Sequence, residues 1–132
     1  MSQEKHYAFL NKSNVVKSIL VYRDEELPEG YASFEDYYGE AMGMRCKRAC
    51  PDTLKGKHTS GGVPFRGNYP ELGYVYDDSI DAFVPEKPFP SWILNTNSYS
   101  WNAPVEYPSD TEFDYVWSEK GKSWRAVSPS LD

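Results

Sequence analysis

Cysteine and histidine, the residue types that supply most ligands of structural zinc sites, are few in this sequence. Two cysteines, Cys46 and Cys50, lie in the stretch CKRAC, and His58 follows them. A structural zinc site requires four ligands, and this CxxxC…H pattern has no standard zinc spacing and lacks a fourth ligand. The sequence therefore predicts two reduced structural thiols, with a disulfide or a metal site as alternatives. We expect no metal and no other cofactor.

Acid–base chemistry has equally little support. The two histidines, His6 and His58, do not have the surroundings of a general base, and no serine lies in a GxSxG nucleophile elbow. Asp77, Ser79 and Asp81 alternate as ligands do in a calcium loop, but the glycine and the distal glutamate of the EF-hand pattern are missing. We interpret these three as turn residues. No catalytic residue is assigned, and the chain is expected not to be an enzyme.

The elements that position aromatic side chains are much clearer, because one pattern occurs three times. The copies are YVYDDSIDAF (74–83), WILNTNSYSW (92–101) and YVWSEKGKSW (115–124). Each places two large side chains on one face of an extended strand, then turn-forming Asp, Asn, Ser or Gly, then Phe or Trp. Each copy is therefore predicted to be a β-hairpin whose aromatic residues face each other across the strands.

The aromatic residues of these copies are predicted to be core or interface residues. They are Tyr74, Tyr76, Phe83, Trp92, Trp101, Tyr115, Trp117 and Trp124. Because a single hairpin is barely stable in water, we expect the three to pack side by side and share one aromatic layer. Trp101→Ala is then expected to lower the free energy of unfolding by about 3–5 kcal/mol.

The front of the chain predicts a further hairpin and one helix. Tyr7–Leu10 and Val15–Tyr22 are predicted strands, and the second has apolar residues on both faces, which predicts a central strand. A short helix is predicted between an N-cap at Ser33 and a left-handed C-cap at Gly43. It is expected to lie on the sheet, and Met44–Cys50 is predicted to be a strand.

The predicted fold class is α+β, mainly antiparallel β, with an N-terminal hairpin and one short helix followed by three aromatic β-hairpins. The stretch TLKGKHTSGG lacks the residue order of a phosphate-binding loop and is predicted to be a mobile surface loop. We expect a single domain, 1–132, with a hairpin-helix lobe at 1–62 and a three-hairpin lobe at 63–127.

Charge and hydropathy exclude some classes of partner. The formal net charge is −6, which argues against binding to nucleic acid. No apolar run approaches the roughly 20 residues that span a bilayer, and the first residues lack the pattern of a signal peptide. We expect a soluble protein made in the cytoplasm that binds neither nucleic acid nor membrane. Its eleven tyrosines are of a type enriched at protein interfaces.

The segment RGNYPELGYVYDDSIDAFVPEKPFPSWILNTNSYSWNAP resembles small virion structural proteins of tailed bacteriophages, especially phages of marine cyanobacteria. The N-terminal hairpin and helix resemble the same family, and Glu86 departs from it where a second proline is frequent. The residues that carry the resemblance are Arg66, Asn68, Tyr69, Gly73, Tyr74, Tyr76, Asp77, Phe83, Pro85, Lys87, Pro88, Ser91, Trp92, Leu94, Asn95, Trp101, Pro104, Tyr115, Trp117 and Trp124.

The resemblance implies a non-enzymatic structural protein of the virion, made in the host cytoplasm. We expect an accessory component that docks on the capsid or tail through an aromatic face, with other virion proteins as partners and several symmetric copies in the particle. The alternative is a carbohydrate-binding module of the tail or fibre. In that case exposed Trp and Tyr would stack on sugars, and the Asn residues of NTNSYSW would hydrogen-bond to them.

Overall fold

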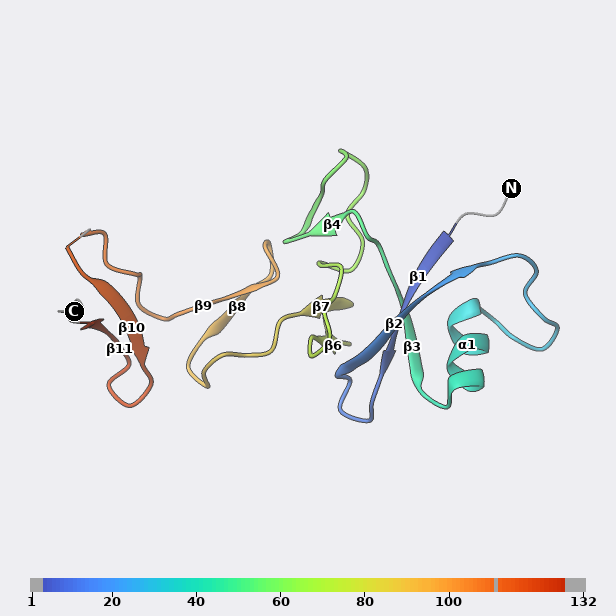
Figure 1. Ribbon diagram of the computed structural model, residues 1–132, viewed down its shortest axis with the longest axis horizontal. Helices are drawn as coiled ribbons and strands as arrows, with labels where there is room; N and C mark the ends of the chain where they lie inside the picture. The colour runs from blue at the N-terminus through green and yellow to red at the C-terminus, as the bar shows by residue number, and fades with distance from the viewer. Residues whose placement is uncertain (1–3, 111, 128–132) are drawn as a thin grey trace, which may run out of the picture. The chain divides into compact units, whose positions relative to one another are not determined.

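Antiparallel strands make up most of the regular structure, with one short helix, and this confirms the predicted fold class (Figure 1). The structure is a computed structural model that describes residues 4–110 and 112–127. Its elements are β1 (Glu4–Leu10), β2 (Val16–Arg23), α1 (Phe34–Met42), β3 (Arg45–Ala49), β4 (Thr53–Leu54), β5 (Lys57–His58), β6 (Val75–Asp77), β7 (Ala82–Val84), β8 (Ile93–Asn95), β9 (Ser100–Asn102), β10 (Asp114–Ser118) and β11 (Ser123–Val127).

All three repeat copies are hairpins, as predicted. Strand β6 pairs with β7, β8 with β9, and β10 with β11. In the first copy Tyr76 lies opposite Phe83, and in the third Trp117 lies opposite Trp124. The aromatic positions of the repeat therefore do meet across the strands in these two hairpins.

The contacts within the chain divide it into two compact units. Of the described residues, 4–86 and 96–100 form the first unit, and 87–95, 101–110 and 112–127 form the second. The lobes expected from the sequence, 1–62 and 63–127, divide the chain at a different point. The difference arises because the hairpin β6–β7 belongs with the N-terminal sheet.

The N-terminal sheet has the strand order β2-β1-β3, so β1 lies in the middle. The prediction that β2 is central is wrong. Strand β3 pairs with β1, with Phe9 opposite Cys46, and leaves β2 at the edge. The apolar residues on the two faces of β2 are only partly covered, since Leu20 and Val21 are exposed. An apolar pattern on both faces is therefore compatible with an edge strand in a small sheet.

The helix begins and ends at the predicted caps. The Ser33 side chain accepts a hydrogen bond from the Asp36 backbone N–H at 3.1 Å, and Gly43 has φ 66°, in the left-handed region. On the sheet side Phe34 and Tyr38 pack against a buried cluster of Tyr7, Phe9 and Cys46. The expectation that the helix lies on the sheet is thus confirmed.

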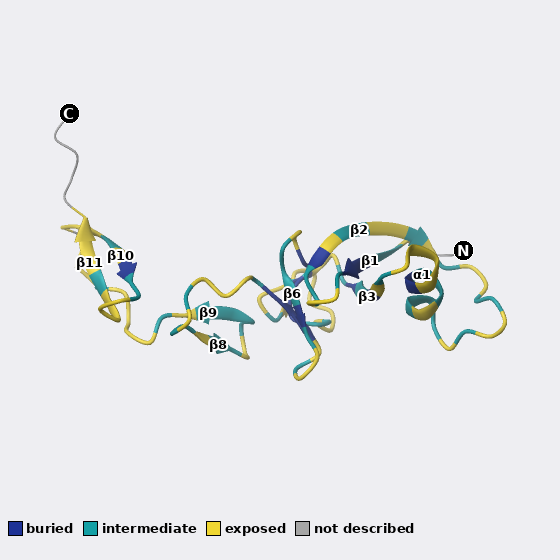
Figure 2. Cartoon of the chain, turned by 90° about the horizontal axis from the view of Figure 1, so that it is seen from below, coloured by how far each residue is buried: buried dark blue, intermediate teal, exposed yellow. Residues whose placement is uncertain are grey.

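The opposite face of β1 contributes to a second buried cluster. Side chains alternate along a strand, so Ala8 and Leu10 lie on the face away from Tyr7 and Phe9. They pack with Val16, Ala49, Tyr76 and Phe83, and Figure 2 shows these buried stretches of the first unit in dark blue. The expected single aromatic layer is therefore wrong. The aromatic pair of the first hairpin completes the core of the N-terminal sheet instead.

The stretch predicted to be a mobile surface loop contains a small hairpin, so that prediction is wrong in part. Strands β4 and β5 pair with Thr53 opposite His58. The Thr53 side chain is buried, and its hydroxyl accepts a hydrogen bond from the Phe65 N–H at 3.0 Å. His58 Nδ1 accepts hydrogen bonds from the backbone N–H groups of Ser60 and Gly62, which organises the following turn.

Gly67 marks a close approach that predicts a destabilising substitution. It has φ 76°, and an added Cβ would lie 2.7 Å from Cγ of Tyr99. Gly67→Ala should lower the free energy of unfolding by more than about 1 kcal/mol, since the positive φ and the clash add. The matched control is Gly61→Ala, where φ is 82° and nothing lies within 4 Å of the added Cβ. Equal losses in urea unfolding of the two variants would contradict the packing of Tyr99 on Gly67.

Both cysteines are free thiols. Cys46 lies in the buried cluster beneath the helix, and this burial, with Glu35 nearby, raises the pKa of its thiol to about 12. It is therefore protonated at neutral pH and a poor nucleophile. Cys50 follows the end of β3 and is half-buried.

Candidate binding site

The repeat aromatics occupy two different settings. Tyr76 and Phe83 are buried in the first unit, and Tyr74 packs against the same cluster. The other five, Trp92, Trp101, Tyr115, Trp117 and Trp124, belong to the second unit. Of these only Trp117 is buried, at 8% exposure. The first group lies in or against the core of the first unit, whereas four of the five in the second group remain partly exposed.

The aromatic rings of the second unit meet edge to face. The ring of Trp124 lies 5.3 Å from that of Trp117, 6.0 Å from that of Trp92 and 4.9 Å from that of Tyr107. Interplanar angles of 64° to 75° place these rings steeply against one another. This is a favoured geometry for aromatic pairs, and it gives the unit a core made largely of rings.

A groove of about 450 Å³ lies beside these rings, and we call it the aromatic groove. Its lining residues are Trp92, Trp101, Asn102, Ala103, Val105, Glu106, Tyr107 and Trp124. Tyr107 is 48% exposed and Val105 is 45% exposed, so part of the apolar lining faces solvent. The groove thus brings together three predicted site residues from two hairpins and the segment between them.

Sequence reasoning missed the segment 102–107, which supplies most of the lining. Tyr107 lies outside the repeat, so periodicity gave no reason to select it. The available signal was a tyrosine and a valine in a short stretch that no strand pattern explains. Tyr115, which the repeat did select, does not line the groove; its N–H instead donates to the Tyr107 hydroxyl at 3.1 Å.

The polar atoms of the tryptophans are satisfied unequally. Trp124 Nε1 donates to the Val105 carbonyl at 2.7 Å, and Trp117 Nε1 donates to Glu119 at 3.0 Å. Trp92 Nε1 is buried and has no hydrogen-bond partner among the described residues. Buried donors are nearly always paired, so this indole N–H is an exception that calls for an explanation.

Glu119 fixes the hairpin β10–β11 by accepting several hydrogen bonds. Its donors are Lys122, Ser91 and the Trp117 indole. These hydrogen bonds, that of Lys122 first, lower the pKa of the Glu119 carboxyl to about 2. The residue is therefore ionised at neutral pH and acts as an anchor for the ring cluster.

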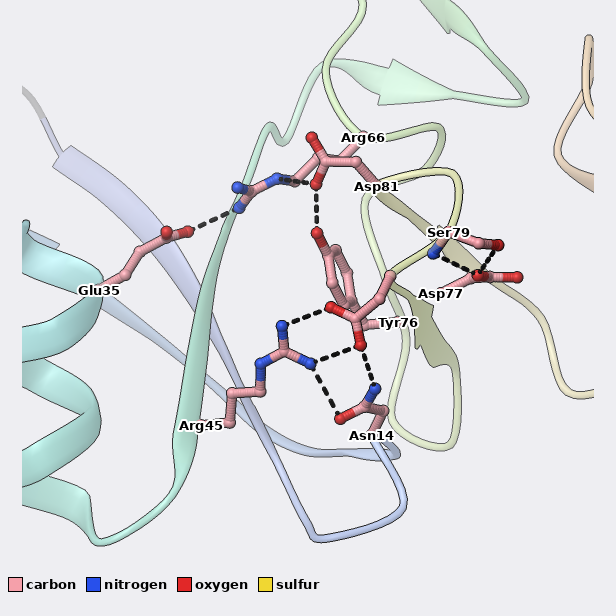
Figure 3. Close-up of polar contacts among 9 residues, drawn as sticks. Asn14, Glu35, Arg45, Arg66, Tyr76, Asp77, Ser79 and Asp81 are labelled. Carbon is pink, nitrogen blue, oxygen red and sulfur yellow. Dashed lines mark hydrogen bonds and ion pairs between the residues drawn. The ribbon is translucent and has the colours of Figure 1, made fainter.

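The aspartates of the first hairpin accept hydrogen bonds from within the chain, and Figure 3 shows those of Asp77 and Asp81. Asp77 accepts from the N–H and hydroxyl of Ser79, as expected for a turn. Asp78 accepts from Arg45 at 2.9 and 2.5 Å and from Asn14 at 3.0 Å. Among residues 4–110 and 112–127, no three His, Cys, Asp or Glu residues are grouped closely enough to hold a metal ion.

Acid should weaken the contact of Asp78 with Arg45 and Asn14. The hydrogen bonds from Arg45 are the main cause that lowers the pKa of its carboxyl to about 2, whereas an unfolded Asp has a pKa near 3.9. In this range the unfolded chain binds more protons, so stability contributed by Asp78 is present above about pH 4 and is lost as the pH falls towards 2. The urea midpoint should fall more steeply across this range in the native chain than in Asp78→Asn. Parallel pH profiles would contradict the contribution of Asp78.

A hollow of about 630 Å³ in the first unit is an alternative site, and both of its carboxylates are already engaged. Asp24 accepts from the hydroxyls of Tyr7 and Tyr38, and Glu35 accepts from the Arg66 guanidinium and the Arg48 N–H. Burial and the Asp24 hydrogen bond raise the pKa of both tyrosines. Both carboxylates of this hollow therefore already accept hydrogen bonds from the chain itself, and neither is free to act as a general base.

No protein-family model, curated protein or solved structure matches the chain. The search for membrane-spanning helices, over the residues that the structure describes, found none that is long and apolar enough.

Proposed function

We propose that this chain is a non-enzymatic structural protein of a tailed-phage particle and docks on the capsid or tail through the aromatic groove. The observation that carries the docking is the set of aromatic and apolar residues that line this groove and remain partly exposed, with Tyr107 and Trp101 among them. Aromatic side chains are enriched at the centres of protein interfaces, because they bury a large rigid area at low entropic cost.

The resemblance of the sequence to virion proteins supports docking on the phage particle. Partners would then be other virion proteins, and symmetry would repeat the contact in several copies per particle.

Binding rather than catalysis is supported by the pairing of the carboxylates. Asp24, Glu35 and Asp81 each accept hydrogen bonds from side chains of the chain itself. A general base needs a carboxylate or imidazole within reach of a substrate proton. The aromatic groove offers Glu106 as its single carboxylate and no histidine.

Saccharide binding in the same groove is the second candidate, and Asn102 favours it. Asn102 lines the groove together with three tryptophans, and an amide can both donate to and accept from a sugar hydroxyl. Indole faces that remain partly exposed can stack on a sugar ring. A titration of the chain with host-surface glycans, followed by tryptophan fluorescence, tests this candidate.

The proposed function is tested by quantitative mass spectrometry of purified particles of the phage that encodes the chain. We expect the chain in the particles at a fixed ratio to the major capsid protein. A copy number close to that of the capsid protein indicates capsid decoration, and a small multiple of the tail symmetry indicates the tail. Particles that contain no copy of the chain, although infected cells contain it, would overturn the proposal.

A further inference from the structure

The rings of the aromatic groove form notches rather than one flat surface. Tyr107 meets Trp124 at 75°, and Trp92 meets Trp124 at 64°. A sugar stacks best on a flat, open ring face. Rings set steeply against one another instead form concave corners, against which a short rigid ring such as that of proline can pack. Proline-rich segments in the polyproline II conformation dock on aromatic-lined grooves in this way.

The unpaired indole N–H of Trp92 fits the same kind of ligand. Trp92 lines the groove, and its Nε1 is buried without a partner among the described residues. A polyproline II segment has no internal hydrogen bonds, so its backbone carbonyls are available to accept one. A modest shift of the ring on binding would pair this donor with a carbonyl of the ligand.

Glu106 gives the groove a carboxylate with which a cation of the ligand can pair. Glu106 lines it and has no ion pair among residues 4–110 and 112–127. In addition, the ammonium of Lys87 lies over the ring of Trp101 at 5.5 Å, in a segment where Pro85 and Pro88 flank it. A groove indole therefore already holds a lysine from a proline-containing stretch of the same chain by a cation–π contact.

We infer that the aromatic groove binds a proline-rich segment of a partner protein that carries a lysine or arginine. The prolines pack in the corners where two rings meet, a backbone carbonyl accepts from Trp92 Nε1, and the cation pairs with Glu106. This inference rests on the proposed docking function and names the chemistry of the partner segment.

The test uses the full chain, labelled with ¹⁵N, and three synthetic peptides of equal length. One consists of Pro-Pro-Lys repeats, the second of Gly-Ser-Lys repeats and the third of Pro-Pro-Glu repeats. The four tryptophans give four indole N–H signals, and three of these belong to the groove residues Trp92, Trp101 and Trp124. The Pro-Pro-Lys peptide is expected to shift the signal of Trp92 most, and the other two peptides are expected to bind at least several-fold more weakly.

Glu106→Gln tests the charge in the inference. It should weaken binding of the Pro-Pro-Lys peptide about two- to five-fold, as expected for a partly exposed ion pair, and make binding less dependent on salt. The matched control is Glu112→Gln, since Glu112 is an exposed acid of the same unit that does not line the groove. Its affinity should equal that of the native chain. Near-ultraviolet circular dichroism checks that both variants keep the ring cluster.

Three results would overturn the inference. They are equal binding of the proline and the glycine–serine peptides, absence of any indole shift, and a shift of the groove indoles by a β-glucan or mannan oligosaccharide but not by Pro-Pro-Lys. The proposed function fails separately. If the chain binds Pro-Pro-Lys but is absent from purified particles, only the proposed role in the virion is contradicted. If the chain is present in particles but binds none of the peptides, only the inferred proline-rich partner is contradicted.

Discussion

Phe83→Ala should lower the free energy of unfolding by about 3–5 kcal/mol, which is the cost of removing a buried phenylalanine and leaving a cavity. Phe83 is 0% exposed and packs with Tyr76, Leu10 and Val16 between the hairpin β6–β7 and the N-terminal sheet. Its backbone N–H and carbonyl keep their partners, Arg66 and Asn68, in the variant. The loss therefore measures the side chain alone. Urea unfolding followed by far-ultraviolet circular dichroism gives the value.

Phe113→Ala is the control for this measurement. Phe113 is the same residue type but is 41% exposed, just before β10. Its replacement should change the free energy of unfolding by less than about 1 kcal/mol, as for most surface positions. If Phe83→Ala were as mild as Phe113→Ala, the hairpin β6–β7 would not complete the core of the N-terminal sheet.

Arg66→Ala should be nearly as damaging, by about 3 kcal/mol, because it leaves partly buried charges without compensation. The Arg66 guanidinium donates to Glu35 at 2.6 Å, to Asp81 at 3.0 Å and to the Arg48 carbonyl at 3.0 Å, as Figure 3 shows for the two carboxylates. The Arg66 side chain is 13% exposed. It links the helix, strand β3 and the turn of the first hairpin.

The controls for Arg66 are an exposed ion pair and a double-mutant cycle. Arg23 pairs with Glu4 at 3.8 Å, and both side chains are more than half exposed, so Arg23→Ala should cost no more than about 1 kcal/mol. Glu35→Gln combined with Arg66→Ala should cost less than the sum of the single changes, since neither charge is then left alone. Strictly additive losses would contradict the coupling between Glu35 and Arg66.

Local structure was predictable from the sequence because its signals are local. The three hairpins follow from turn residues between aromatic pairs, and the helix follows from Ser33 and Gly43 at its two ends. The strand order was not predictable in this way. The middle strand is set by the pairing of β1 with β3, and these two strands are separated in the sequence by β2 and the helix. The apolar pattern of β2 carries no information about this long-range pairing.

The division of the aromatic residues between core and groove was also beyond the sequence. The repeat gives Phe83 and Trp101 equivalent positions, yet Phe83 is fully buried and Trp101 is half-buried. The difference is set by what packs against each hairpin, and this involves residues far away in the chain. The large decrease in the free energy of unfolding that the sequence predicts for Trp101→Ala is therefore expected for Phe83→Ala instead. Trp101→Ala is expected to cause a smaller decrease.

The candidate site was predictable in part. The sequence singled out Trp92, Trp101 and Trp124, which line the groove, but its repeat pattern did not select Tyr107 and Glu106, which lie between the repeats. Arg66 was named only through the resemblance to virion proteins. Arg66 joins Glu35 to Asp81 from a left-handed backbone conformation, φ 55°, through contacts with two segments that are distant in the sequence. No local sequence pattern predicts these contacts.

Electron cryo-microscopy of the intact particle tests the central claim most directly. We expect density for the chain at symmetry-related positions on the capsid or tail, with the groove of Trp101, Tyr107 and Trp124 filled by a segment of the neighbouring protein. Density in which this groove faces solvent, while another surface of the chain makes the contact, would contradict docking through the aromatic groove.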